Sequence, residues 1–143
     1  MLVVVHGALR DSGRYLGHAG TALARPGARM LVIAPQFLAD VDVAAGVVPR
    51  RNVWDVEGWK GGQPATGPAT ISSFTAMDRL LLQLAGPARL PGRGQRAVVI
   101  VGNSAGGQYV SRYAAVGQAP DVAHDGCAGQ QNRPAEQQRH ARR

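Results

Sequence analysis

The sequence predicts an α/β fold in which a short parallel sheet lies between layers of helices. Three short apolar runs, at about 2–5, 30–34 and 97–101, are rich in branched side chains, as in strands buried on both faces. Helical segments are expected after them, at 13–24, 74–84 and 105–115. This β-α-β-α-β-α order is typical of parallel sheets with right-handed crossovers. We therefore expect a three-layer sandwich in which the second and third strands flank the first.

The first expected helix begins after Asp11 or Ser12, either of which can accept a hydrogen bond from the first helical turn. It ends before Pro26, which cannot continue a helix. We expect His18 on the solvated side of this helix. The apolar residues that form its inner face are Tyr15, Leu16, Ala19, Ala22 and Leu23.

The second expected helix is capped by Ser72 or Ser73 and carries Asp78 on its outer face. Its inner face follows a period near 3.6 and consists of Met77, Leu80, Leu81 and Leu84. The preceding segment, 35–71, has no sustained period and is too long for a simple connection. Two alternatives stay open for its tryptophans: Trp54 and Trp59 either line a binding pocket or pack this long segment.

Composition excludes several classes of protein. The chain has 143 residues and a formal net charge of +7, but its arginines are spread along it without interleaved aromatic residues. We therefore expect no nucleic-acid partner. A single cysteine, Cys127, excludes an internal disulfide, and no Cys/His spacing is typical of a metal site. No apolar run reaches the ~20 residues of a membrane span, and the start does not resemble a signal peptide, so we expect a cytoplasmic protein.

The segment Gly102-Asn103-Ser104-Ala105-Gly106 fits the pattern G-x-S-x-G between the third expected strand and its helix. In this nucleophile elbow, a sharp turn exposes the serine hydroxyl above the sheet edge, and the glycines let strand and helix approach closely. The glycine spacing of a dinucleotide-binding loop and the lysine of a Walker loop are both absent, so we expect no cofactor. The alternatives are a turn that only packs strand against helix, or one that cradles a phosphate.

Three motifs in order, "VVVHGALR", "LVIAPQF" and "VGNSAGG", resemble the α/β-hydrolase family. The resemblance extends over about 2–117. Within the family, the combination of motifs is similar to that of uncharacterised bacterial and fungal hydrolases. It implies that Ser104 is the nucleophile and that the backbone N–H groups of Ala105 and Ala8 form an oxyanion hole. The substrate would be a small molecule with a carboxylic ester or similar acyl bond. Five further residues would support the site: His6, Gly7, Gly102, Asn103 and Gly106.

The catalytic triad of this family runs serine, acid, histidine along the chain. His6 precedes Ser104, so we expect it to be structural or supporting. Two further β-α units would need about 60 residues before the acid, whereas 39 residues follow Ser104. No acid or histidine after Ser104 follows a strand-like run, and none is assigned: Asp121, His124, Asp125, Glu136 and His140.

We therefore expect residues 1–117 to be a partial α/β-hydrolase domain and the chain to be a poor enzyme as it stands. Residues 118–143 contain five Gln, no aromatic residue and one branched aliphatic residue, Val122. Such a segment cannot bury enough apolar surface to offset its ordering entropy, so we expect a disordered tail. The alternative function is that of a non-catalytic α/β fragment or binding module.

Overall fold

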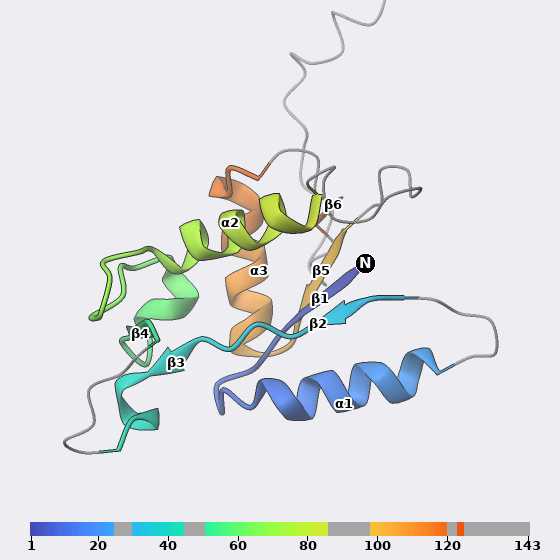
Figure 1. Cartoon of the computed structure of the whole chain (residues 1–143), viewed down its shortest axis with the longest axis horizontal. Helices are drawn as coiled ribbons and strands as arrows, with labels where there is room; N and C mark the ends of the chain where they lie inside the picture. Colours follow the sequence, from blue (N-terminus) through green and yellow to red (C-terminus); the bar gives the residue numbers. More distant parts are fainter. Residues whose placement is uncertain (25–29, 45–50, 86–97, 120–122, 125–143) are drawn as a thin grey trace, which may run out of the picture.

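The strand β1 (Leu2–Val5) lies inside the sheet because other strands pair with both of its edges. A computed structural model of the chain describes residues 1–24, 30–44, 51–85, 98–119 and 123–124. In this part, β2 (Val32–Ile33) pairs with one edge of β1 and β5 (Val99–Gly102) with the other, while β6 (Ala123–His124) pairs with β5. All of these pairs are parallel (Figure 1). The predicted α/β class and the flanking of the first strand by the other two are confirmed.

The register brings the ends of β1 and β5 to one level, because Val5 lies opposite Gly102. The residues that follow them therefore emerge at the same edge of the sheet. The strand predicted at 30–34 is shorter in the structure, at Val32–Ile33. Beyond it the chain leaves β1, and the Phe37 N–H donates to Nε2 of His6 at 3.0 Å instead of to a strand.

Three α-helices lie within one residue of the predicted bounds: α1 (Ser12–Leu23), α2 (Ser73–Ala85) and α3 (Ala105–Val116). Figure 1 shows α1 on the opposite side of the strands from α2 and α3. Asp11 caps α1 by accepting a hydrogen bond from the Arg14 N–H at 3.0 Å. On α1 the predicted inner face is wrong at Leu16, which is 43% exposed, and at Ala22, which is also exposed. No side chain of this helix is fully buried.

The segment between β2 and α2 folds into short elements rather than one long helix or strand. The strands β3 (Leu38–Ala39) and β4 (Val53–Trp54) form a parallel pair, and two 3₁₀ helices follow them, η1 (Asp40–Asp42) and η2 (Gly58–Gly61). Strands of two residues leave no periodic signal, which is why the sequence predicted none. Three large aromatic side chains of this segment are buried: Phe37, Trp54 and Trp59.

Beyond Gly117 the structure differs from the predicted disordered tail at two residues. Ala123 and His124 form β6, in register with Val99 and Ile100 of β5. The rest of that tail, apart from Gln118 and Ala119, lies outside the described residues. In the part of the chain that is described, no helix has the length and apolar character needed to cross a membrane.

Candidate functional site

Ser104 lies in the turn between β5 and α3, with an exposed side chain and φ 56°, ψ −121°. A positive φ is uncommon for a residue with a Cβ atom and costs about 1–3 kcal/mol. The surrounding hydrogen bonds hold the turn in place: the Gly106 N–H donates to the Asn103 carbonyl at 2.9 Å, and the Gln108 N–H donates to the Ser104 carbonyl at 3.1 Å. The turn therefore has the sharp backbone that the elbow pattern predicts.

The two glycines of this turn are required by close backbone approach. A Cβ atom on Gly102 would lie 2.3 Å from the carbonyl oxygen of Gly106. A Cβ atom on Gly106 would lie 2.4 Å from the carbonyl oxygen of Val5 and 2.5 Å from that of His6. These neighbours are backbone atoms and cannot rotate away. The start of α3 is thus pressed against the end of β1, beside the loop that begins at His6.

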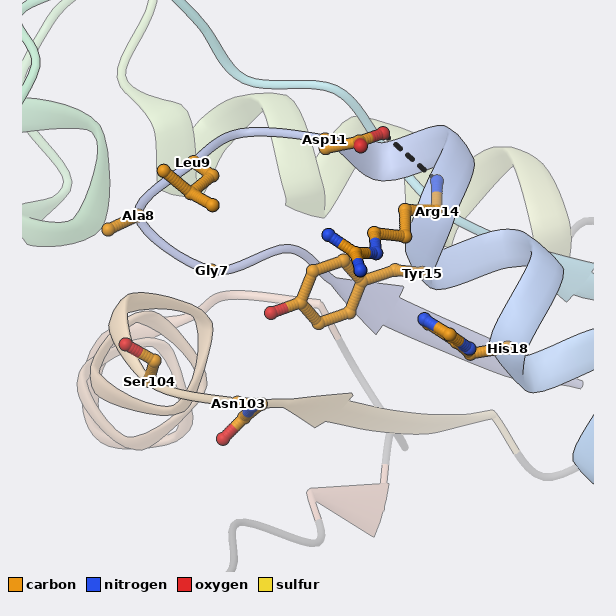
Figure 2. A pocket seen from close by; sticks show the side chains of 9 residues that line it. All are labelled: Gly7, Ala8, Leu9, Asp11, Arg14, Tyr15, His18, Asn103 and Ser104. Carbon is orange, nitrogen blue, oxygen red and sulfur yellow. Dashed lines mark hydrogen bonds between the residues drawn. The ribbon is translucent and has the colours of Figure 1, made fainter.

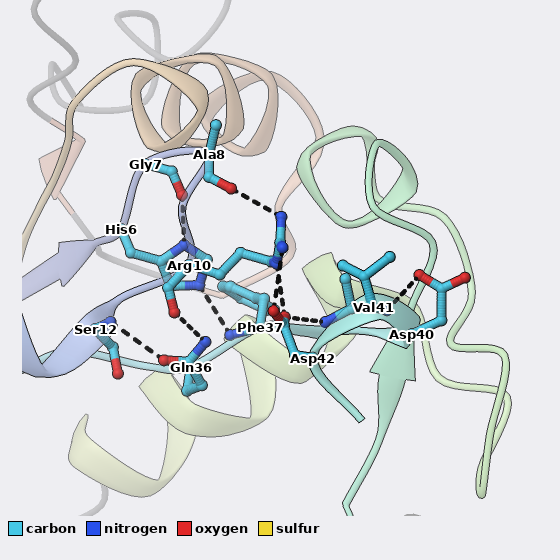
Figure 3. A network of polar contacts seen from close by, with 11 residues as sticks. His6, Gly7, Ala8, Arg10, Ser12, Gln36, Phe37, Asp40, Val41 and Asp42 are labelled. Carbon is cyan, nitrogen blue, oxygen red and sulfur yellow. Dashed lines mark hydrogen bonds and ion pairs between the residues drawn. The ribbon is translucent and has the colours of Figure 1, made fainter. Parts of the chain in front are cut away.

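His6 is fully buried, and both of its ring nitrogens have partners (Figure 3). Nε2 accepts from the Phe37 N–H at 3.0 Å, so Nδ1 carries the proton and donates to the Gly7 carbonyl, also at 3.0 Å. Burial lowers the pKa of His6, and the positive charge of Arg10 lowers it further, against opposing contributions from the Gly7 carbonyl and Asp42. His6 is therefore a neutral, fixed imidazole with no nitrogen free to act as a base toward Ser104.

The loop that follows His6 is held so that one N–H group faces away from the core. The Gly7 carbonyl accepts hydrogen bonds from His6 Nδ1 and, at 3.0 Å, from the Arg10 N–H. In a trans peptide the N–H points opposite to the carbonyl. The Ala8 N–H is therefore directed away from His6, and it has no acceptor among the described residues. The Ala105 N–H, at the start of α3, likewise has none in the described part of the chain.

Arg10 fixes this loop from outside (Figure 3). It has φ 54°, and its guanidinium forms a two-point contact with Asp42 of η1, at 2.6 and 3.1 Å. It also donates to the Ala8 carbonyl at 2.8 Å. The hydrogen bond from Arg10 lowers the pKa of Asp42, and the same bond raises the pKa of Arg10. Sequence reasoning missed the roles of both residues: Arg10 ends the motif "VVVHGALR" but was given no function, and its partner Asp42 lies 32 positions away.

A pocket of about 410 Å³ lies between this loop, α1 and the elbow (Figure 2). Four residues predicted for the site line it together: Gly7, Ala8, Asn103 and Ser104. The remaining lining residues are Leu9, Asp11, Arg14, Tyr15 and His18. His18 is exposed as predicted, but it also lines the pocket. The inner-face spacing of α1 could have pointed to Tyr15, whereas nothing in the sequence pointed to Arg14.

Trp54 and Trp59 do not line this pocket; both are buried and pack the long segment, which is the second of the two alternatives that the sequence left open. Both are buried in an aromatic cluster in which Phe37 stacks on Trp59 with ring centroids 5.5 Å apart. Trp59 also lies 4.7 Å from the ring of His6 and 5.8 Å from that of Tyr109. Their contribution to the site is indirect: Trp59 packs against the imidazole that holds the Gly7 carbonyl, and Trp54 packs against Phe37, which contacts the same imidazole.

Asp78 does not lie on the outer face of α2 as predicted. Its Oδ1 accepts hydrogen bonds from the Tyr113 hydroxyl of α3 and from the N–H groups of Gln118 and Ala119, the latter two at 3.0 Å. The carboxylate thus joins α2 to the C-terminal end of α3, away from the pocket. A helical period cannot show this, because the partners follow Asp78 by 35 to 41 residues.

Across residues 1–24, 30–44, 51–85, 98–119 and 123–124, no three His, Cys, Asp or Glu side chains gather closely enough to hold a metal ion. Comparison with family models, with curated proteins and with solved structures finds no match to this chain. The geometry of the elbow, the loop and the pocket is therefore the basis for the function proposed below.

Proposed function

We propose that the chain carries the nucleophile and oxyanion hole of an α/β-hydrolase-type serine hydrolase that acts on carboxylic esters or similar acyl bonds. One observation carries this proposal: Ser104 adopts a positive φ at a strand-to-helix turn and lines a pocket with Ala8. A turn that only connects strand and helix needs no strained serine. Backbone strain of this kind is concentrated at functional sites. A phosphate-binding turn would not require a serine hydroxyl exposed in this way.

The chemistry follows from the groups that line the pocket, together with the N–H group of Ala105, which follows Ser104 at the start of α3. The Ser104 hydroxyl oxygen attacks the carbonyl carbon of the ester, and the carbonyl π electrons move onto oxygen. The N–H groups of Ala8 and Ala105 donate to that oxyanion, an interaction worth about 3–4 kcal/mol per donor in the transition state. Collapse of the tetrahedral intermediate breaks the bond to the alkoxy group, which takes up a proton and leaves as the alcohol. Water then hydrolyses the acyl-serine to the carboxylic acid and restores the Ser104 hydroxyl. The N-terminal end of α3 adds a partial positive charge at the same point.

The attack also requires a base to accept the proton of Ser104. His6 cannot serve because both of its nitrogens are engaged. In the described part of the chain, no imidazole or carboxylate forms a hydrogen bond with the Ser104 hydroxyl. A neutral hydroxyl is a weak nucleophile near pH 7. We therefore propose that this chain turns esters over slowly and reacts poorly with fluorophosphonate probes unless a base is added.

The test supplies that base. The purified chain is incubated with p-nitrophenyl acetate at pH 7.5, with and without imidazole, and acetylated serines are identified by peptide mass spectrometry. In the presence of imidazole, we expect acetylation of Ser104 to exceed that of Ser111 at least tenfold. Ser111 is an exposed serine on α3 and serves as an internal control.

The variant Ser104→Ala should remove the imidazole-dependent release of nitrophenol above the background of imidazole itself. Equal acetylation of Ser104 and Ser111, in protein whose circular dichroism shows a folded α/β chain, would reject the hydrolase proposal. That result would favour the alternative, a non-catalytic binding module.

A further inference from the structure

Tyr15 brings a hydroxyl group to the pocket that the motifs did not indicate. It lies in the first turns of α1, and its side chain is half-buried between the helix and the loop after β1. Figure 2 shows its hydroxyl pointing away from α1, toward Gly7 and the elbow. A Cβ atom on Gly7 would lie only 2.6 Å from the Tyr15 hydroxyl oxygen, so this oxygen rests directly against the Gly7 backbone.

The hydroxyl has no hydrogen-bond partner among the residues that the structure describes. A half-buried tyrosine usually finds a partner for its O–H group. Its position beside Gly7 is one peptide away from the Ala8 N–H, and both residues line the pocket that contains Ser104. A donor without a partner, next to the expected oxyanion position, is available to a ligand.

We infer that the Tyr15 hydroxyl is a third hydrogen-bond donor to the oxyanion, beside the N–H groups of Ala8 and Ala105. This inference rests on the proposed function. Negative charge develops on the carbonyl oxygen only as Ser104 attacks, so a donor fixed there stabilises the transition state more than the bound ester. Tyr15 is thus a catalytic residue, and the absence of a side chain at position 7 is what lets its hydroxyl reach the site.

The experiment uses phenylboronic acid, which imitates the tetrahedral intermediate without needing a leaving group. The serine oxygen forms a bond to boron, its proton passes to water, and the boron becomes four-coordinate and negatively charged. Binding to the purified chain is followed by ¹¹B NMR, which distinguishes trigonal from tetrahedral boron. We expect a tetrahedral signal for the unaltered chain, no such signal for Ser104→Ala, and about tenfold weaker binding for Tyr15→Phe.

The controls separate the two proposals. Thr21→Ala, a change on an exposed part of α1 outside the pocket, should leave the affinity within twofold. A chain that gives no tetrahedral signal, or the same signal in Ser104→Ala, would overturn both the hydrolase function and the role of Tyr15. Loss of the signal in Ser104→Ala together with unchanged affinity in Tyr15→Phe would overturn the role of Tyr15 alone.

A stability measurement tests the position of the hydroxyl without any ligand. In the unaltered chain, Gly7→Ala places a Cβ atom 2.6 Å from the hydroxyl oxygen but 3.6 Å from the ring carbon that bears it. In the Tyr15→Phe background the closer contact is gone. We therefore expect Gly7→Ala to lower the urea midpoint in the unaltered chain and to lower it clearly less in Tyr15→Phe. Equal losses in both backgrounds would show that the hydroxyl does not rest on Gly7.

Discussion

Ser104 and the glycines beside it form one structural unit. The serine accepts a positive φ, and the glycines leave room for the start of α3 against the end of β1. The strain at Ser104 persists because the carbonyl of Asn103 and that of Ser104 itself are both held by N–H groups of α3. The sequence pattern predicted all three residues at this turn, because it describes a serine on a sharp strand-to-helix turn between two glycines that allow close backbone approach.

His6 was less predictable, because its role depends on a partner 31 residues away. The motif placed His6 in the loop after the first strand, and its position before Ser104 in the chain argued against a role as the general base. Neither observation indicated that His6 accepts a hydrogen bond from the Phe37 N–H. That hydrogen bond requires a neutral Nε2, and it is made in a buried aromatic surrounding. A residue of this kind is identified by its distant neighbours, which a single sequence does not show.

The buried His6 predicts a loss of stability in mild acid. Its pKa is lowered in the folded chain, whereas in the unfolded chain it should titrate near 6.5. Below about pH 6.5 the unfolded state therefore binds a proton that the folded state does not, and the free energy of unfolding falls with decreasing pH by at most about 1.4 kcal/mol per unit. The loss stops once the pH is below the folded pKa. Urea unfolding followed by tryptophan fluorescence between pH 7.5 and 5 measures this slope.

The matched control is His18, which is exposed on α1. His18→Asn should keep the acid-dependent slope, whereas His6→Asn should lower stability at pH 7.5 and flatten the slope between pH 6.5 and 5. The Arg10–Asp42 pair faces His6. Because the pKa of Asp42 is lowered, its contribution to the free energy of unfolding is lost only at lower pH than that of His6. A slope that survives in His6→Asn would assign the acid sensitivity to other groups.

At the scale of elements, Asp78 links α2 to the end of α3. One carboxylate oxygen accepts from the Tyr113 hydroxyl and from two backbone N–H groups just beyond α3. Burial raises the pKa of Tyr113, and its hydrogen bond with Asp78 raises it further, so this hydroxyl stays a proton donor. Without the carboxylate, two N–H groups past the helix end would lose their acceptor.

Asp78→Ala should therefore reduce the free energy of unfolding by about 2 kcal/mol, because hydrogen bonds to a charged acceptor are among the stronger ones. Asp78→Asn keeps one carbonyl oxygen and should lose less. The adjacent exposed residue of α2 provides the control: Arg79→Ala should change stability by less than about 0.5 kcal/mol. Urea titration of the three variants measures these differences. Equal losses for Asp78→Ala and Arg79→Ala would show that the link contributes nothing.

The elements themselves were largely predictable, and the reasons differ among them. The helices have apolar spacing, and serine or aspartate side chains accept hydrogen bonds at the start of α1 and α2, so the helix bounds were confirmed to within a residue. The strand at 30–34 was overestimated, because an apolar run does not show where the chain leaves its neighbour to bind His6. The pair β3–β4 and the two 3₁₀ helices were not predicted, since elements of two to four residues carry no period.

At the scale of the whole molecule, the predicted sheet, in which 30–34 and 97–101 flank the first strand, would expose these two apolar segments as its edges. The structure changes this expectation at one edge, where β6 pairs with β5. At the other edge, β2 pairs only with β1 in the described sheet. The residues leading into β2 are apolar and open to solvent: Met30 is 52% exposed and Leu31 is 46% exposed. An uncharged apolar strand edge of this kind promotes pairing with another chain.

We therefore expect the purified chain to self-associate through β2. Leu31→Lys places a charge beside this edge, and edge lysines discourage strand pairing. It should shift the protein from large species toward the monomer in size-exclusion chromatography with light scattering. Leu82→Lys adds the same charge at a similarly exposed leucine, 53% exposed on α2, so it controls for a general effect of net charge. We expect little change from Leu82→Lys. Equal improvement by both variants, or a monomeric unaltered chain, would show that the β2 edge does not drive association.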